Sequence, residues 1–207
     1  MSTSRELLPR RAMETFGIEL SVSELERIDL FIELLIHWSS RLNLVAVRSA
    51  QELVDRHVLD SLALTALTRS VKTASDLGSG AGFPGMLMAI TAPTTQVHLL
   101  EARGKRATFL RKSVRVLELD NVEVWPIRGE HWQSDERPEL VAVRGMRTDE
   151  AATVARSILA VGGMLALMCK QGAGRPENRD YEEVQRMSYR LPGGEPHEVL
   201  VLRFRPR

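Results

Sequence analysis

Residues 75–85 read SDLGSGAGFPG, a stretch that places four glycines and a proline around and after the acidic residue Asp76. A glycine inside a helix or strand costs roughly 0.5 to 1 kcal/mol relative to alanine, so such a cluster is typical of a turn that a ligand approaches closely. The stretch therefore predicts a binding loop. The segments on either side indicate which fold carries it.

Short apolar runs follow the loop and alternate with amphipathic stretches as far as residue 169. The runs predict strands, and the amphipathic stretches predict helices. The expected strands are 73–77, 96–101, 122–127, 140–143 and 164–169, and the expected helices begin after Pro84 and cover 105–117 and 149–159. Alternation of this kind favours an α/β fold with a parallel sheet covered on both faces. Residues 184–204 look like two further strands joined at PGGEP, which predicts a closing antiparallel hairpin.

The first 70 residues have helical spacing instead. Apolar residues at 22, 25, 28, 32, 35 and 38 would line one face of a helix, and Ser21 with Glu24 forms a capping box at its start. A second long helix is expected over 50–67, where Ser49 and Glu52 repeat the capping signal. We therefore expect a helical extension over 1–70 and a sheet-bearing domain over 71–207, packed as one unit.

The composition limits the possible classes of protein. A chain of 207 residues with 43% hydrophobic content suits one domain with its own core. The single cysteine, Cys169, excludes an internal disulfide, and we expect it to be a core residue in a reducing compartment. No apolar stretch reaches the roughly 18 residues that span a bilayer, so a cytoplasmic protein is expected. The formal charge of +1 means that a surface for polyanions must be local.

Two kinds of ligand fit the glycine loop. Gly80, Gly82 and Gly85 satisfy G-x-G-x-x-G, in which a pyrophosphate lies at a helix amino terminus. Asp76 would repel a pyrophosphate, whereas it would attract the ammonium group and offset the sulfonium charge of S-adenosylmethionine. Asp76 therefore favours S-adenosylmethionine over a dinucleotide, with Gly78 and Gly80 allowing the close approach.

The ends of the next two strands predict contacts with a nucleoside. Glu101 ends the second strand, where a carboxylate accepts hydrogen bonds from both ribose hydroxyls in NAD and S-adenosylmethionine sites alike. Gly129 and Glu130 follow the third strand, where an adenine would lie and where the glycine leaves room for its ring. Phe83 either packs against the ligand or only fixes the following helix.

Several segments match a known family in the same order along the chain. They are RLNLVAVRSAQELVDRHVLDSL (41–62), DLGSGAGFPG (76–85), LLEARGKRATFLRKSVRVLELDNVEV (99–124), VRG (143–145) and KQG (170–172). Over nearly its whole length the chain resembles the bacterial small-subunit (16S) rRNA guanine-N7 methyltransferases, also called glucose-inhibited division protein B. The segments N-L-x-A-V-R and R-H-x-L-D-S are more specific to that family than the glycine loop is.

The resemblance implies a class I, Rossmann-like methyltransferase fold with a helical extension. It also implies methyl transfer from S-adenosylmethionine to N7 of a guanine near the decoding region of 16S rRNA. The matching cofactor positions are Gly78, Phe83, Gly129, Glu130 and Arg144. Family members usually show S-R-A around the arginine, where this chain has V-R-G.

Arg144 is the residue that we expect to assist the reaction. Guanine N7 carries a lone pair and no proton, so its methylation needs no general base, and positioning does most of the work. Arg144 would anchor the cofactor carboxylate, or contact guanine O6 and share the developing charge. The alternative is an ordinary salt bridge.

A local basic surface is expected to bind the RNA phosphates. Its predicted members are Arg56, His57, Lys105, Arg106 and Lys170, with Arg41, Arg48, Arg103, Arg111, Lys112 and Arg115 nearby. His57 and Asp60 lie about one helical turn apart, so we expect them to hold each other. No metal is expected, because no further His or Cys has a suitable spacing.

Other functions stay open at this point. The glycine motif also fits an NAD-dependent oxidoreductase, which would bind NADH and not S-adenosylmethionine. A non-catalytic RNA-binding protein with a vestigial loop is a second alternative. A paralogous methyltransferase acting on another RNA or a small molecule is a third. The expected partner is 16S rRNA or the small ribosomal subunit, with the protein as a monomer.

Overall fold

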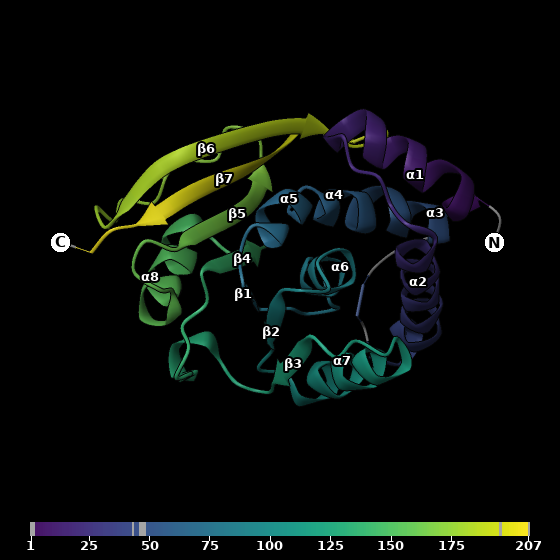
Figure 1. The fold of residues 1–207 in the computed structure, drawn as a ribbon, viewed down its shortest axis with the longest axis horizontal. Coiled ribbons are helices and arrows are strands. Elements are labelled where there is room, and N and C mark those ends of the chain that lie inside the picture. Colours follow the sequence, from purple (N-terminus) through teal and green to yellow (C-terminus); the bar gives the residue numbers. More distant parts are fainter. Residues whose placement is uncertain (1–2, 43, 46–48, 195, 207) are drawn as a thin grey trace.

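A single sheet forms the centre of the protein (Figure 1). The computed structural model describes residues 3–42, 44–45, 49–194 and 196–206. The strands are β1 (Thr73–Leu77), β2 (Gln96–Leu100), β3 (Val122–Trp125), β4 (Leu140–Arg144), β5 (Met164–Lys170), β6 (Tyr181–Arg190) and β7 (Pro196–Phe204). Their order is β3-β2-β1-β4-β5-β7-β6. The pairs among β1 to β5 are parallel and β7 is antiparallel to both neighbours, so the predicted sheet and hairpin are confirmed.

Helices precede the sheet and alternate with its parallel strands. Before the sheet come α1 (Thr3–Phe16), α2 (Val22–Leu42), α3 (Ala50–Leu53), the π-helical turn η1 (Val54–Val58), α4 (Leu59–Leu62) and α5 (Thr65–Arg69). Between the strands lie α6 (Gly85–Thr91), α7 (Gly104–Val116), the 3₁₀ turn η2 (Gly129–His131) and α8 (Thr148–Ile158). Each helix predicted between the strands is present. Within the described residues, none of the helices has the length and apolarity needed to cross a membrane.

The two predicted capping signals differ in outcome. At α2 the box is reciprocal, because Glu24 accepts from the backbone N–H of Ser21 at 2.7 Å and Ser21 Oγ accepts from that of Glu24 at 3.2 Å. At α3, Ser49 Oγ accepts from the Glu52 N–H at 3.1 Å, while the Glu52 carboxylate binds Arg56 at 3.0 Å. Both serines therefore cap their helices as the sequence predicts.

The prediction of one continuous helix over 50–67 is wrong. The chain widens into the π turn η1, in which the backbone N–H of Leu59 reaches the carbonyl of Val54. It then tightens, because Ala63 and Leu64 donate to carbonyls three residues back, at 3.2 Å each. Propensity does not reveal such a change of hydrogen-bond register, which is frequent at functional sites.

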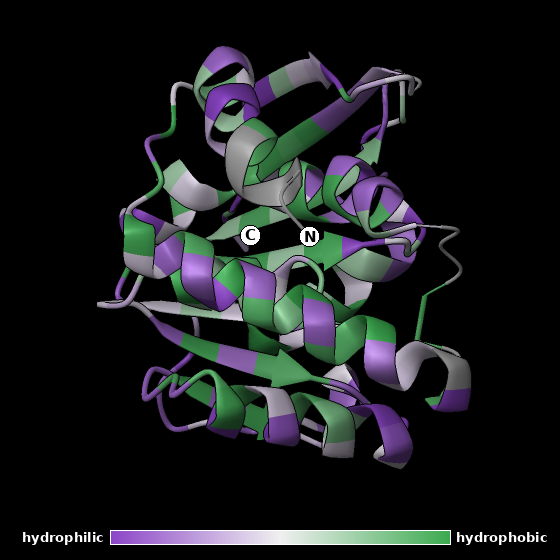
Figure 2. Cartoon of the chain, turned by 90° about the vertical axis from the view of Figure 1, so that its right-hand side faces the viewer, coloured by the Kyte–Doolittle hydropathy of each residue, from purple (hydrophilic) through white to green (hydrophobic). Residues whose placement is uncertain are grey.

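Two apolar cores lie on opposite faces of the sheet because strand side chains alternate. In β4, Leu140 and Ala142 belong to the core shared with α2, α6 and α7, while Val141 and Val143 belong to the core under α8. Figure 2 shows the helices on the first face with alternating hydrophilic and hydrophobic bands, and strands behind them that are largely hydrophobic. The sheet is thus covered on both faces, as expected for parallel strands.

Phe31 joins the amino-terminal helices to the first core. Its side chain is fully buried, and its ring centroid lies 5.4 Å from that of Phe83 and 6.5 Å from that of Phe109. It also lies directly beneath the glycine loop, since a Cβ added at Gly82 would come within 2.9 Å of Phe31 Cζ. Helix α2 therefore supports the loop rather than packing separately from it.

The two edges of the sheet differ in character. Strands β1, β2, β4 and β5 all end at one edge, where the glycine loop connects β1 to α6. At the other edge lie two cavities of about 380 and 360 Å³, which share Arg27, Pro93 and Thr94 and do not include the glycine loop. Open α/β sheets bind ligands at the carboxyl ends of their strands, so the loop edge is the candidate site.

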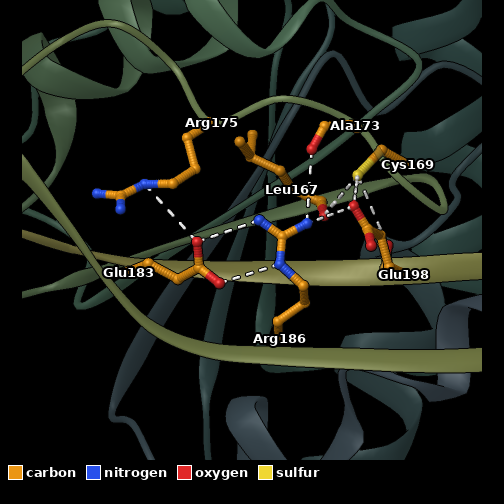
Figure 3. A network of polar contacts seen from close by, with 7 residues as sticks. All are labelled: Leu167, Cys169, Ala173, Arg175, Glu183, Arg186 and Glu198. Carbon is orange, nitrogen blue, oxygen red and sulfur yellow. Dashed lines mark hydrogen bonds and ion pairs between the residues drawn. The ribbon is translucent and has the colours of Figure 1, made fainter.

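The carboxyl-terminal hairpin carries a polar cluster beside β5 (Figure 3). Arg186 Nη1 contacts the buried carboxylate of Glu198 at 2.7 Å, and the Sγ of Cys169 lies 3.8 Å from the same carboxylate. Burial, with the nearby charge of Glu198, raises the pKa of the Cys169 thiol to about 11. Cys169 is only half-buried and lies beside these polar groups. The prediction that it is a residue of the apolar core is therefore wrong.

Replacement of Phe31 tests whether the extension and the sheet share one core. The change Phe31→Ala should lower the free energy of unfolding by about 3 to 5 kcal/mol, because it leaves a cavity under the glycine loop. Urea unfolding followed by circular dichroism measures it. Val22→Ala is the control, since Val22 on the same helix is 73% exposed and should change stability by less than about 0.5 kcal/mol. Equal small effects would contradict a shared core.

Candidate cofactor and RNA site

The glycine loop is open on one side and packed on the other. Gly78, Gly80 and Gly82 have φ angles of 78°, 56° and 101°, a region that L side chains rarely adopt. A Cβ at Gly78 would meet nothing within 4 Å, whereas a Cβ at Gly82 would lie 2.7 Å from Met86 Cγ. Gly78 and Gly80 therefore offer bare backbone to a ligand, and Gly82 allows the loop to lie close against the core.

Asp76 lies beneath this loop. Its side chain is almost fully buried, and Oδ2 accepts a hydrogen bond from the backbone N–H of Gly85 at 2.9 Å. Oδ1 is buried and has no hydrogen-bond partner among the described residues. A Cβ at Gly85 would lie 2.6 Å from Oδ2, so only glycine allows this contact. Asp76 thus holds the first turn of α6 and keeps one oxygen uncommitted.

The surroundings of Asp76 make its negative charge unfavourable without a cationic partner. Burial raises the pKa of the Asp76 carboxyl to about 7, against the opposing effects of the Gly85 hydrogen bond, the nearby Ser79 hydroxyl and the positive charge of Arg144. The neighbouring charge of Glu101 raises it further. A cation placed nearby would stabilise the ionised form, so the carboxyl is suited to a positively charged ligand.

Glu101 fixes the outer part of the loop. Its Oε2 accepts from the N–H of Gly80 at 2.8 Å, and its Oε1 accepts from the N–H of Arg103 at 2.7 Å. The side chain is 5% exposed at the carboxyl end of β2, beside the open face of the loop. A carboxylate oxygen can accept more than one hydrogen bond, so both oxygens of Glu101 retain capacity for a vicinal diol such as a ribose.

The residues after β3 have different surroundings. Gly129 is buried, and a Cβ there would lie 2.2 Å from Leu77 Cδ1 and 2.8 Å from Val154 Cγ1. Glu130 is half exposed, with its carboxylate 3.8 Å from Arg128. Gly129 is therefore required for close packing of η2 against β1 and α8. The adenine contacts of Gly129 and Glu130 stay a prediction.

Phe83 packs into the protein interior. It is 7% exposed and lies between Phe31 and the imidazole of His57, which is stacked on it with centroids 5.3 Å apart. Phe83 thus packs against residues of the amino-terminal helices, and its contact with a cofactor stays a prediction. Through Phe83, the position of the glycine loop depends on both α2 and η1.

His57 is neutral at pH 7. Burial, together with the positive charge of Arg144, lowers the pKa of His57 to about 4. Its Nδ1 is buried and has no hydrogen-bond partner in the part of the chain that the structure describes. His57 therefore adds no positive charge to an RNA-binding surface, and any contact with RNA would be a neutral one.

The expected pairing of His57 with Asp60 is replaced by a cluster around Asp60. Asp60 is 1% exposed, and its Oδ1 accepts from the Tyr189 hydroxyl at 2.7 Å and lies 3.1 Å from His197 Nδ1. Its Oδ2 lies 2.9 Å from Nε of Arg144. We call Asp60, Arg144, Tyr189 and His197 the Asp60 cluster. Tyr189 and His197 were not foreseen from the sequence, in which the only signal is the polar character of His197 beside the apolar run of β7.

Arg144 lies at the end of β4, at the same edge as the glycine loop. Besides Asp60, its guanidinium contacts the backbone carbonyl of Arg56 through Nη2 at 3.0 Å. The salt bridge considered as an alternative role for Arg144 is thus present, with Nη1 making no hydrogen bond to the described residues. The following Gly145 has a φ of 77°, so the glycine of V-R-G allows a left-handed turn that the alanine of S-R-A rarely adopts.

Several predicted RNA-binding residues border this edge. Lys105 is exposed in the first turn of α7, and Nη1 of Arg106 would lie 3.7 Å from a Cβ at Gly80. Lys170 is the last residue of β5 and lies opposite His197 of β7 in the register of the sheet. With Arg56 on η1, whose carbonyl accepts from Arg144 at the end of β4, these residues lie towards the same edge of the sheet as the glycine loop. Arg48 lies outside the described residues.

Other basic residues extend along the packed pair α2 and α7. Lys112 lies over the Trp38 ring at 4.5 Å, and Arg41 lies over the same ring at 5.7 Å. Arg111 donates to the carbonyl of Val124 at 3.2 Å. Part of this charge therefore serves helix packing. Over the described residues, no group of three or more His, Cys, Asp or Glu is arranged to hold a metal ion.

Comparison with known proteins identifies the family. A model of the family described as rRNA small subunit methyltransferase G matches residues 24–189. The Ribosomal RNA small subunit methyltransferase G of Xylella fastidiosa (strain M23) is 38% identical over 177 residues, covering 83% of each chain. The protein of the same name from Chromohalobacter salexigens is 32% identical over 188 residues, covering 89% of this chain and 90% of the relative.

A solved structure shows the same fold. The N-methyltransferase NodS from Bradyrhizobium japonicum WM9, in complex with S-adenosyl-L-homocysteine, matches with a TM-score of 0.59 at 15% identity. The match covers 81% of this chain and 97% of NodS. The expected class I methyltransferase fold is thereby confirmed, as is the family resemblance seen in the motifs. The chain belongs to the rRNA small subunit methyltransferase G family.

Proposed function

We propose that this protein transfers a methyl group from S-adenosylmethionine to N7 of a guanine in 16S rRNA, near the decoding region. The observation that carries the proposal is the glycine loop, with bare backbone at Gly78 and Gly80 above the buried Asp76 carboxyl. Family membership favours methyl transfer over the NAD-dependent chemistry that the glycine motif alone left open.

The residues at the loop fit S-adenosylmethionine in charge and shape. The uncommitted Oδ1 of Asp76 is suited to the positive end of that cofactor, and the carboxylate of Glu101 is suited to its ribose. A pyrophosphate would instead lie close to both carboxylates, which would repel it. Bound there, the cofactor would supply an electrophilic methyl group on sulfur.

The protein's part in the reaction is positioning. N7 of guanine needs no deprotonation, so no side chain has to act as a base. Methylation places positive charge on the purine, so the part of Arg144 would be to position the guanine through O6 or to hold the cofactor carboxylate, rather than to stabilise that charge. Neutral His57 adds no further positive charge beside Arg144.

The basic residues around the loop would hold the RNA backbone. Lys105 and Arg106 on α7, Arg56 on η1 and Lys170 on β5 come from three different elements at one edge of the sheet. Phosphate contacts fix the orientation of an RNA, while the pocket selects the base. We propose that the extension over 1–70 supplies part of this surface, and that the protein acts as a cytoplasmic monomer.

Methyl transfer to defined RNA tests the function. Purified protein and labelled S-adenosylmethionine are incubated with small subunits and with 16S rRNA from cells that lack this protein. The expected product is 7-methylguanine at one position, located by chain cleavage at the modified base. Substrates from cells that contain the protein are the control and should take up little label. Label elsewhere, or none on either substrate from the deficient cells, would refute the proposal.

The raised pKa of Asp76 predicts a pH dependence of cofactor binding. Because the cation favours ionised Asp76, affinity for S-adenosylmethionine should rise about tenfold as the pH increases from about 6 to about 8. The cofactor-free protein should lose stability as the pH rises through about 7, since the folded state favours the protonated carboxyl. Calorimetric titration and urea unfolding at several pH values measure both.

The matched variant for this prediction is Asp76→Asn, which keeps the shape and cannot ionise. Its affinity for the cofactor should be weaker and nearly independent of pH over the same range. S-adenosylhomocysteine lacks the sulfonium charge and should show a smaller rise with the native protein. An equal rise in the Asp76→Asn variant would show that another group titrates.

Charge reversal tests the RNA surface. The changes Lys105→Glu and Arg106→Glu should each weaken rRNA binding by about tenfold at moderate salt and reduce its salt dependence, because phosphate contacts are lost. Filter binding at several salt concentrations measures both quantities. Lys72→Glu is the control, since Lys72 is an exposed lysine at the opposite edge of the sheet. Equal effects of all three changes would contradict a localised surface.

A further inference from the structure

The Asp60 cluster brings together parts of the chain that are far apart in sequence. Asp60 lies on α4, Arg144 on β4, Tyr189 on β6 and His197 on β7. The Tyr189 hydroxyl bonds to an aspartate 129 positions away. One carboxylate in the amino-terminal helices thus contacts three strands at the loop edge of the sheet.

The partners of Asp60 overcome its burial. Burial alone would raise the pKa of Asp60, but the hydrogen bond from His197, the charge of Arg144 and the hydrogen bond from Tyr189 lower it overall. Asp60 is therefore ionised at neutral pH and forms a true ion pair with Arg144. A buried ion pair contributes little net stability relative to apolar residues of similar size. Its geometry, rather than its contribution to stability, is the feature that needs explanation.

The cluster determines the orientation of the Arg144 guanidinium. Nε is held by Asp60 at 2.9 Å, and Nη2 is held by the carbonyl of Arg56 at 3.0 Å. Both contacts come from the amino-terminal helices, while the backbone of Arg144 belongs to the sheet. The side chain is 22% exposed, so part of it is open to a ligand at this edge.

We propose that Asp60 is a positioning residue, which, held by Tyr189 and His197, orients Arg144 for the ligand and couples the amino-terminal helices to the methyl-transfer site. The inference rests on the proposed function in that Arg144 is taken to contact cofactor or guanine. It also gives a physical role to the R-H-x-L-D-S segment. Arg56 contributes its carbonyl, His57 packs on Phe83, and Asp60 orients Arg144.

A buried carboxylate on the β6–β7 hairpin, which also carries Tyr189 and His197, provides a matched control. Glu198 is 2% exposed and binds Arg186 at 2.7 Å, within the polar cluster that Figure 3 shows. It is adjacent to His197 in β7, yet its contacts with Arg186 and Cys169 do not involve Arg144. Glu198→Gln therefore perturbs a comparable buried ion pair without touching the proposed site.

The experiment compares Asp60→Asn, Arg144→Lys, the double variant and Glu198→Gln. Two quantities are measured: the Kd for S-adenosylhomocysteine by calorimetry, and kcat and KM for methyl transfer. Asp60→Asn should change the same quantity as Arg144→Lys, by at least about tenfold, and the double variant should be no worse than Arg144→Lys alone. Glu198→Gln should change each quantity less than about twofold.

A spectroscopic measurement reports the orientation directly. The Nε–H signal of Arg144 in nitrogen-15 spectra is assigned by its loss in Arg144→Lys. It should exchange slowly with water in the native protein and in Glu198→Gln, and faster in Asp60→Asn, because the ion pair with the buried Asp60 carboxylate, 2.9 Å from Nε, limits the access of water to that group. If Asp60→Asn does not fold, Tyr189→Phe takes its place. This variant keeps the ring contact with Phe16, at 5.0 Å between centroids, and should give a smaller increase in the exchange rate of the Arg144 Nε–H.

The outcomes separate the inference from the proposed function. Absence of methyl transfer by the native protein would refute the function, while the Kd and exchange measurements would still test the positioning. Independent, multiplying effects of Asp60→Asn and Arg144→Lys would overturn the inference. So would unchanged exchange of the Arg144 Nε–H in both Asp60→Asn and Tyr189→Phe, or no effect of Arg144→Lys on any measured quantity.

Discussion

Two buried carboxylates hold the glycine loop against the sheet, and the rest of the site depends on this constraint. Asp76 accepts from the N–H of Gly85 at the inner end of the loop, and Glu101 accepts from the N–H of Gly80 at its outer end. Both carboxylates can accept further hydrogen bonds, and the buried surroundings of Asp76 disfavour its negative charge. The groups that shape the loop are thus also the groups that favour a cation with a diol.

The amino-terminal helices are part of the same arrangement. Phe31 supports the loop from below, His57 packs on Phe83 beside it, and Asp60 holds Arg144 at the end of β4. The solved methyltransferase that this chain resembles in fold shares the sheet at low sequence identity, so the shared fold alone does not define the substrate. In this protein, the helices that precede the sheet add Phe31, His57 and Asp60 to the surroundings of the glycine loop and Arg144.

Local patterns in the sequence were sufficient to predict the sheet. Most of the parallel strands are short apolar runs, and the glycine loop lies between the first strand and a helix, so β1 to β5 and the position of the loop could be predicted from spacing. The π turn η1 did not, because its hydrogen-bond register depends on the packing of Val54 and Val58. The partners of Asp60 could not be predicted either, because Tyr189 and His197 come near Asp60 only once the hairpin has folded. The lowered pKa of His57, which makes the side chain neutral at pH 7, likewise arises mainly from burial, and residue spacing does not reveal burial.

The most direct test is the crystal structure of the protein with S-adenosylhomocysteine. The account predicts that the ribose hydroxyls lie within about 3 Å of the Glu101 carboxylate. It also predicts that the ligand contacts the backbone of Gly78 and Gly80, and that Arg144 keeps its ion pair with Asp60. Ligand bound instead in the cavities at the opposite edge, beside Lys72 and Asn121, would contradict it.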